Sequence, residues 1–255
     1  MNRFEQIALS AHQASWTLPM RRELYRRVRL VSRMSVLDVG CGDGAITSQL
    51  AEICKHRVVG VDHDGEILEA AKARGCRAEF MKMDAYALEF PESSFDLVTC
   101  HWLLLWLKDP VAALKEFKRV LKAGGSLLIA CEPDYGGRMV WPEAAELKDE
   151  LVRALRAEGA DPFVGRKLAG LLIEAGFSSH CGLYPGVWDS SMEQGCLESE
   201  KDWLKRVLTG HETEAKINRA LSSLDAAYQS GGLMMLTPVF WAVGAPLSRA
   251  EQLGL

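Results

Sequence analysis

The residues best suited to bind a ligand begin with two glycines in the segment VLDVGCGDGAI, residues 36–46. Gly40 and Gly42 let the backbone turn sharply and approach a ligand closely, because a Cβ at either position would collide or forbid the required dihedral angles. Together with Ala45 they satisfy the G-x-G-x-x-G/A fingerprint of dinucleotide-binding proteins. The turn therefore predicts a closely held ligand and leaves its identity open.

Three acidic residues at the ends of successive apolar runs restrict which ligand the glycine turn could bind. Asp38 lies two residues before Gly40, where it would repel a pyrophosphate and attract a cation, unless it only caps the following turn. Asp62 follows about 20 residues beyond the glycines, the place of a ribose-binding acid. Asp84 follows the third run, where it can accept the exocyclic amine of adenine beside the N–H of Ala85. The set fits S-adenosylmethionine, a cationic ammonium and sulfonium compound, better than NAD.

The elements that must position these residues alternate from residue 35 onward between apolar β-rich runs and helical patterns, as in a parallel sheet covered on both faces. Asp109, Pro110 and Gly124 bracket one helix, and Asp64 and Gly75 bracket another. The predicted strands are Ser35–Val39, Arg57–Val61, Cys76–Met83, Phe95–Cys100, Ser126–Cys131, Ser179–Val187 and Met235–Val243.

Two helical regions fall outside this alternation. Residues 3–30 predict two helices, the second opening near Pro19 with arginines that we interpret as a solvated basic face. Met192–Ser230 predicts two more, centred on KDWLKRVL and EAKINRALSSLDAAY. Because repeats and linkers are lacking, we expect a single domain over residues 1–255. Its expected parts are a helical extension at 1–34, a cofactor-binding core at 35–134, and the rest of the sheet with substrate-side insertions at 135–255.

Composition restricts the class of protein. The chain has 255 residues, of which 48% are hydrophobic and 25% charged, as in a globular domain with a large core. A net charge of −4 gives no general attraction for nucleic acid. Seven scattered cysteines, without a C-x-x-C pair or a suitably spaced histidine, predict reduced thiols and no metal site. No signal peptide or apolar run long enough for a membrane helix is evident, so we expect a cytoplasmic protein without a membrane partner.

Several segments resemble, in order, the motifs of class I S-adenosylmethionine-dependent methyltransferases: VLDVGCGDG, VVGVDHD, MDAYALEFPESSFDLVTC and LKAGGSLLIACEPD. The resemblance is close over Ser35–Asp134, and AGLLIEAGF and VFWAVGAP resemble the closing helix and strands. It implies an α/β fold, a Rossmann-like three-layer α/β/α sandwich. Its seven-stranded, mostly parallel sheet would have the order 3-2-1-4-5-7-6 with an antiparallel seventh strand. An N-terminal helical lid and a helical insertion before the last strand would complete it.

The resemblance also implies S-adenosylmethionine as the cofactor and a set of residues that hold it. The methionine part would be surrounded by Asp38, Gly40, Cys41 and Gly42. The ribose and adenine would be held by Asp62, His63, Asp84 and Ala85, and Cys100 and His101 would pass beneath the sulfonium. Cys41 between the glycines departs from the commonest pattern, although small residues are frequent there.

Methyl transfer from a sulfonium is an in-line displacement, so positioning and desolvation supply much of the catalysis and no catalytic residue is obligatory. The acceptor must enter over the carboxyl ends of the strands. His101 lies there and is the candidate base, with a packing role as the alternative. The candidate substrate contacts are Trp16, Arg21, Trp106 and Tyr135, with core packing as the alternative for the aromatic residues. Glu132 and Asp134 are left without a role.

The sequence therefore predicts a methyltransferase acting on a small, partly apolar acceptor that is held by aromatic residues. Besides those already named, the aromatic residues expected near the acceptor are Trp102, Trp141, Trp188 and Trp203. A methyltransferase of protein or RNA, an NAD-dependent oxidoreductase and a cofactor-binding protein without catalysis are the alternatives. The oxidoreductase shares the glycine turn and Asp62 but does not explain Asp38 together with Asp84. The motifs specify neither the methylated atom nor the oligomeric state.

Overall fold

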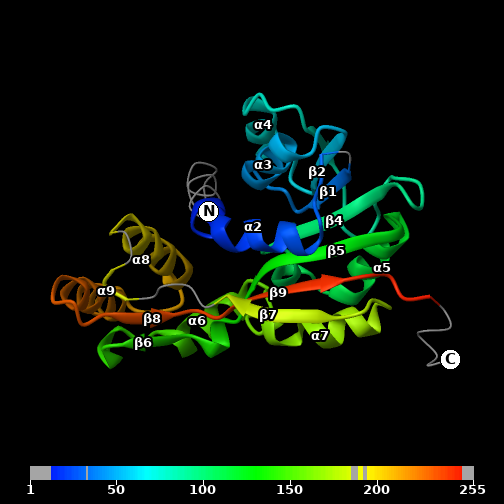
Figure 1. The fold of residues 1–255 in the computed structure, drawn as a ribbon. Coiled ribbons are helices and arrows are strands. Elements are labelled where there is room, and N and C mark those ends of the chain that lie inside the picture. The colour runs from blue at the N-terminus through cyan, green and yellow to red at the C-terminus, as the bar shows by residue number, and fades with distance from the viewer. Residues whose placement is uncertain (1–12, 33, 185–188, 192–193, 249–255) are drawn as a thin grey trace.

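The main sheet of the protein has seven strands in the order β3-β2-β1-β4-β5-β9-β7, as the computed structural model shows for residues 13–32, 34–184, 189–191 and 194–248 (Figure 1). Strands β1 to β5 pair in parallel, whereas β9 runs antiparallel to both β5 and β7. The predicted order and the antiparallel last strand are therefore confirmed. The strands are β1 (Ser35–Val39), β2 (Arg57–Asp62), β3 (Glu79–Lys82), β4 (Phe95–His101), β5 (Leu121–Pro133), β7 (His180–Tyr184) and β9 (Val239–Gly244).

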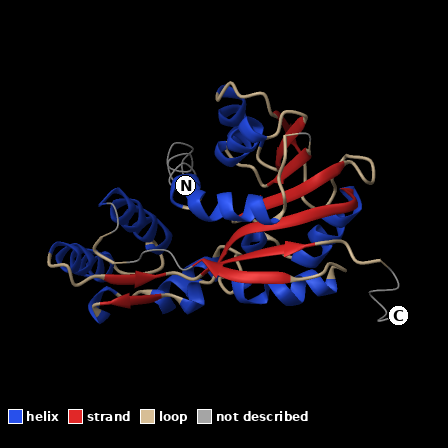
Figure 2. Cartoon of the chain, in the orientation of Figure 1, coloured by secondary structure: helices blue, strands red, loops and turns tan. Residues whose placement is uncertain are grey.

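Helices cover both faces of this sheet, which makes the three layers that the sequence predicts (Figure 2). Side chains alternate between the faces along each strand. Val36 and Leu128 belong to one buried cluster with α2 and α3, and Leu37 and Ile129 to another with α5 and α7. The helices of these layers are α2 (Leu18–Arg27), α3 (Ala45–Ile53), α4 (Gly65–Ala73), α5 (Pro110–Val120) and α7 (Val164–Glu174).

The two predicted helix starts are confirmed. Each depends on a capping aspartate that binds an amide only two or three residues away. Asp109 accepts a hydrogen bond from the N–H of Ala112 at 2.9 Å, and Asp64 accepts one from Glu66 at 2.8 Å. The predicted end of α5 at Gly124 is wrong. Leu121 already pairs with a residue of β4, and its side chain is buried in the core, so the strand takes over immediately after the helix.

The last predicted strand, Met235–Val243, is wrong as a single strand. The chain forms β8 (Met234–Leu236), leaves it at Pro238, and then forms β9. A proline has no N–H to donate to a ladder, so it interrupts the pairing. Strand β8 instead pairs with β6 (Met139–Trp141) in a separate two-stranded sheet, which the sequence analysis did not find.

This small sheet belongs to a lobe beside the main sheet, built with α6 (Lys148–Ala157), α8 (Gln194–Leu208) and α9 (Glu214–Gln229) (Figure 1). The last two confirm the helices predicted within Met192–Ser230. The fully buried guanidinium of Arg138 braces the lobe, donating to Glu200 of α8 at 2.7 Å and to Thr237 at 2.9 Å. One hydrophobic cluster runs from the main sheet into α8 and α9. The single domain over residues 1–255 stays a prediction.

Helix α2 is a core helix, which changes the interpretation of its arginines. Arg22, Arg26, Arg27 and Arg29 are exposed as predicted, whereas Arg21 is fully buried. The Arg21 guanidinium donates to Gln49 of α3 at 2.6 Å and to other neutral oxygen atoms of its own segment, including the carbonyl of Ala14. Most of the first predicted helix falls on residues 1–12, outside the described residues, so a lid formed there stays a prediction.

Other boundaries differ modestly from the predicted ones. Strand β3 begins three residues later than Cys76, and β5 extends beyond Ser126–Cys131 at both ends. The predicted strand Ser179–Val187 is described as β7, and residues 185–187 lie outside the described residues. No helix within the described part of the chain is long and apolar enough to span a membrane.

We expect Leu24→Ala to lower the free energy of unfolding by about 2–5 kcal/mol, because Leu24 is only 1% exposed within the cluster under α2. The matched control is Ile53→Ala, since Ile53 is 40% exposed at the end of α3 and its loss should cost less than about 0.5 kcal/mol. Urea denaturation measures both. Equal losses in the two variants would contradict a core role for α2.

Candidate functional site

A cavity of about 550 Å³ lies at the carboxyl ends of β1, β2 and β4. Its first part is lined by the glycine turn and the loop after β2, and its second part by the loop after β4 together with Tyr135 and residues of α6 and α8. Predicted cofactor-binding residues in the lining are Asp38, Gly40, Cys41, Gly42, Asp62, His63 and His101. The parallel sheet therefore brings together segments that are far apart in the sequence.

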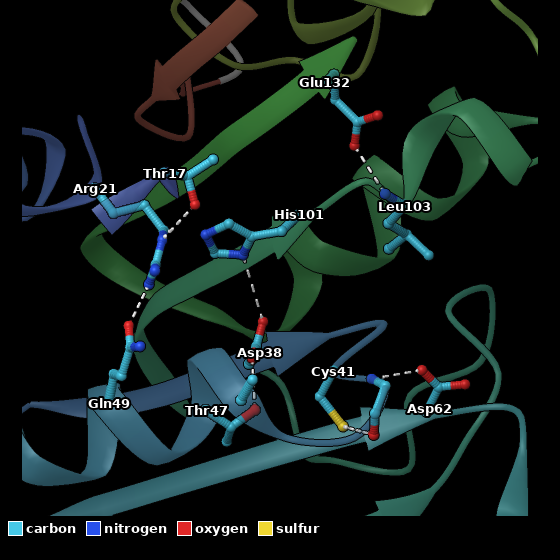
Figure 3. A network of polar contacts seen from close by, with 12 residues as sticks. Thr17, Arg21, Asp38, Cys41, Thr47, Gln49, Asp62, His101, Leu103 and Glu132 are labelled. Atoms are coloured by element: carbon cyan, nitrogen blue, oxygen red, sulfur yellow. Dashed lines mark hydrogen bonds and ion pairs between the residues drawn. The ribbon is translucent and has the colours of Figure 1, made fainter. Parts of the chain in front are cut away.

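Asp38 and Asp62 shape the first part of the cavity. Asp38 is 2% exposed and accepts a hydrogen bond from the Thr47 hydroxyl at 2.6 Å (Figure 3). Burial raises the pKa of Asp38 to about 7, against the lowering effects of Thr47 and of the Arg21 charge. Asp62 accepts from the N–H of Gly42 at 2.9 Å and from that of Asp64 at 3.0 Å, so it ties the glycine turn to β2.

Gly40 has the conformation that the sequence requires of it. Its φ is +70°, and a Cβ added there would lie 2.8 Å from Cδ1 of Leu103. Gly42 also has a positive φ, +53°. Between them Cys41 lines the cavity, and burial raises the pKa of its thiol above the usual range, so the thiol stays protonated. The turn is therefore a tight backbone cradle with Leu103 packed directly over it.

Three predicted cofactor residues lie outside this lining. Asp84 is exposed, and its carboxylate accepts from the N–H of Tyr86 at 2.9 Å within its own turn. Ala85 is partly buried against the main core cluster. Cys100 is fully buried within β4. A cofactor contact by any of these three side chains therefore stays a prediction.

The predicted substrate residues divide in the same way. Trp106 and Tyr135 line the second part of the cavity, and Trp106 is 47% exposed. Trp16 and Arg21 do not line it. The Trp16 ring packs edge-on against Trp102, with centroids 5.8 Å apart and planes at 71°, while Arg21 is enclosed by neutral oxygen atoms. The N-terminal segment still reaches the lining through Gln13.

The aromatic wall includes Trp203 of α8, whose ring stacks on Tyr135 with centroids 5.0 Å apart and planes at 24°. Leu155 of α6 and Val207 of α8 are further apolar residues of this part, and the charged residues Glu158 and Arg206 line the cavity beside them. Of the other aromatic residues expected here, Trp102 also lines the cavity, whereas Trp141 is 61% exposed on the small sheet away from it. Trp188 lies outside the described residues.

Glu132 is a site residue that the sequence analysis left without a role. Its fully buried carboxylate accepts from three successive amides of the loop after β4, those of Leu103 at 3.0 Å, Leu104 at 2.9 Å and Leu105 at 3.3 Å (Figure 3). Burial raises the pKa of Glu132 to about 8, although these hydrogen bonds oppose the rise. The available signal was an acid that directly follows the apolar run SLLIAC, at the end of a buried strand.

Comparison with known proteins agrees with this geometry. A family model for the methyltransferase domain matches residues 37–129. An uncharacterized methyltransferase of Schizosaccharomyces pombe is 33% identical over 219 residues, which cover 79% of this chain and 78% of the relative. A demethylmenaquinone methyltransferase of Lactococcus lactis is 32% identical over 60% of each chain. The solved structure of a Bacillus halodurans protein assigned as a methyltransferase has the same fold, with a TM-score of 0.60 and 20% sequence identity. The match covers 89% of this chain and 98% of that protein.

The chain belongs to the class I S-adenosylmethionine-dependent methyltransferases, an enzyme family. Its cofactor is S-adenosylmethionine, and the first part of the cavity fits that cation. The buried carboxyl group of Asp38 and the half-buried one of Asp62 line it, while Gly40 leaves the space that a Cβ would fill. Within the described ranges, no cluster of three or more His, Cys, Asp or Glu side chains could hold a metal ion.

We expect Glu132→Gln to change how stability depends on pH. The folded pKa of Glu132, about 8, exceeds its usual value of 4.5, so the folded state binds more protons between these values. The stability that this residue contributes therefore falls as the pH rises through this window, by at most about 1.4 kcal/mol per pH unit. Urea denaturation of wild type and variant should show their difference in unfolding free energy changing in that direction between about pH 5 and 8.

Asp134→Asn is the matched control, because Asp134 is a buried acid at the same strand end that is paired with Arg166 rather than with the loop. A difference between wild type and Glu132→Gln that stays constant with pH would contradict the prediction.

Proposed function

We propose that the protein transfers the methyl group of S-adenosylmethionine to a small molecule held in the aromatic part of the cavity. The observation that supports this most directly is the lining of one continuous cavity. Asp38 and Asp62 lie in its first part, and Trp106, Tyr135 and Trp203 lie in its second. A donor site and an aromatic acceptor site that share one cavity suit a displacement in which the two reactants must be aligned.

The cofactor would be held by groups whose types match its parts. We propose that Asp38 and the backbone from Gly40 to Gly42 hold the methionine part, and that Asp62 and His63 hold the ribose and one face of the adenine. When bound, the cofactor supplies an electrophilic methyl group on a cationic sulfur. The contribution of this chain is to orient the acceptor against that carbon and to exclude water. The adenine contact of Asp84 and Ala85 stays a prediction.

The aromatic wall favours a small acceptor over a polymer. A nucleic-acid-modifying enzyme needs accumulated Lys and Arg contacts leading to the reacting group. Two of the exposed arginines of α2 are engaged elsewhere, since Arg26 pairs with Glu23 and the Arg27 guanidinium lies over the Trp241 ring at 4.8 Å. The relative from Lactococcus lactis is named for a small-molecule acceptor, demethylmenaquinone, which is in keeping with this proposal.

We expect Asp62→Ala to weaken binding of S-adenosylhomocysteine by about 1.5–3 kcal/mol, because hydrogen bonds from ribose hydroxyls to a carboxylate would be lost. Isothermal titration calorimetry measures this, with NAD expected not to bind the wild type. Asp202→Ala is the control, since Asp202 is exposed on α8 and does not line the cavity. Unchanged affinity of Asp62→Ala would rule out the ribose role.

Transfer of a labelled methyl group, screened against metabolite, RNA and protein fractions, tests the acceptor class. We expect label in the metabolite fraction. Efficient labelling of purified RNA or of a folded protein, with none in metabolites, would overturn the small-molecule proposal while leaving the methyltransferase assignment intact.

A further inference from the structure

His101 is a buried side chain without a hydrogen-bond partner, at the point where the two parts of the cavity meet. It is 8% exposed and lines the cavity, and neither ring nitrogen has a hydrogen-bond partner. Leaving a buried polar group unpaired is costly, so such a group in an enzyme site points to a ligand that completes it. Thr99 and Arg138 also carry unpartnered buried atoms, but neither residue lines this cavity.

The backbone around His101 is built to place it there. The register between β4 and β5 shifts at this point: Cys100 pairs with Ile129 and His101 with Cys131, so Ala130 of β5 is an extra residue opposite the end of β4. The next residue, Trp102, has a φ of +48°, which is uncommon for a bulky residue and is stabilised by its N–H bond to the carbonyl of Cys131 at 2.9 Å. The backbone is therefore irregular on both sides of His101, where β4 ends beside the cavity.

The charges that face His101 are Asp38 of β1 and Arg21 of α2 (Figure 3). Its Nδ1 lies 3.9 Å from Oδ1 of Asp38. Burial and, second, the Arg21 charge hold the pKa of His101 well below its usual 6.5, so the ring is neutral and its lone pair is free near neutral pH. Asp38 stands close enough to stabilise the imidazolium that would form if the ring took a proton.

From this geometry we infer that His101 is the catalytic base for methylation of a ring-bearing hydroxyl compound, a phenol or an enol; the inference rests on the proposed function. The acceptor oxygen gains the methyl carbon, the electron pair of the broken carbon–sulfur bond stays on sulfur, and the hydroxyl proton passes to a ring nitrogen of His101. A half-turn of the ring about its Cβ–Cγ bond exchanges carbon and nitrogen positions within the same volume. Either orientation therefore fits the pocket.

Charge selects the hydroxyl over other nucleophiles. In the hydroxyl reaction one positive charge leaves sulfur and one appears on His101, so the acids of the cavity face the same net charge before and after transfer. A carboxylate acceptor is already ionised near neutral pH, so it has no proton for a base to remove. An ammonium acceptor would add a second cation beside the cofactor sulfonium. We infer that the acceptor carries a ring because Trp106, Tyr135 and Trp203, which line the cavity, offer flat apolar surfaces.

The test uses three probes that share one ring system: 2-naphthol, 2-naphthoate and 2-(aminomethyl)naphthalene. Their binding to the full-length protein saturated with S-adenosylhomocysteine is measured by calorimetry, and their methylation with a labelled donor. We expect 2-naphthol to bind best and to be methylated. His101→Gln should reduce its methylation at least a hundredfold and its affinity at least threefold, with both measured at saturating cofactor. His211→Gln is the matched control, because His211 is exposed on the loop between α8 and α9 and does not line the cavity.

A spectroscopic measurement reports on the base independently of turnover. In protein labelled with ¹⁵N-histidine, we expect the His101 ring signals, identified by their absence in His101→Gln, to be those of a neutral ring at pH 7. Adding 2-naphthol to the S-adenosylhomocysteine complex should shift them, whereas 2-naphthoate should not.

Tighter binding of either charged probe, no binding of any probe, unshifted His101 signals or full activity of His101→Gln would each overturn this inference. In all of these outcomes the protein still binds S-adenosylhomocysteine, so the proposed function stands. Failure of the wild type to bind S-adenosylhomocysteine would instead overturn the proposed function and this inference with it.

Discussion

The carboxyl group of Glu132 holds together the edge of the sheet on which the site depends. Burying polar oxygen atoms is unfavourable unless hydrogen bonds replace their hydration, and here three consecutive backbone amides donate to them. Those amides belong to the loop that follows β4, so the end of β5 fixes the path of the chain beyond His101. Leu103 in that loop packs over Gly40, which extends the same constraint to the glycine turn. One side chain thus fixes the geometry of both parts of the cavity.

The main sheet and the cofactor end were predictable because their signals are local or periodic. Apolar runs predict β1, β2 and β4 to within a residue, and Asp64 and Asp109 satisfy amides only two or three positions away. A parallel sheet then brings the ends of these strands to one edge, which explains why Asp38 and Asp62 meet in the cavity. The position of Asp84 outside the lining depends on where β3 ends and how its turn folds back, which the motif alone does not specify.

The failures share a different cause, contacts between residues distant in sequence. Arg21 was expected on a solvated basic face or at the substrate, but Gln49, 28 residues further along, completes a buried set of acceptors for it. The role of Glu132 required knowing that the loop after β4 turns back over the end of β5. Strand β6 has only three residues, and its partner β8 lies nearly a hundred positions away, so neither has a clear pattern of its own. Pro238 was the one local warning that the last predicted strand was divided.

The brace at Arg138 joins the start of β6 to α8 and to the residue after β8 through one buried guanidinium. Helix α8 also carries Trp203. Moving α8 to enlarge the acceptor space would therefore strain the contacts of Arg138 and shift β6, α8 and β8 together. The wall of the cavity formed by α8 should therefore move as a rigid unit, and its side chains should not adjust independently. Acceptance of bulkier compounds would then change in discrete steps. Substitutions that broaden selectivity would occur at the Arg138 junction as well as among the residues that line the cavity.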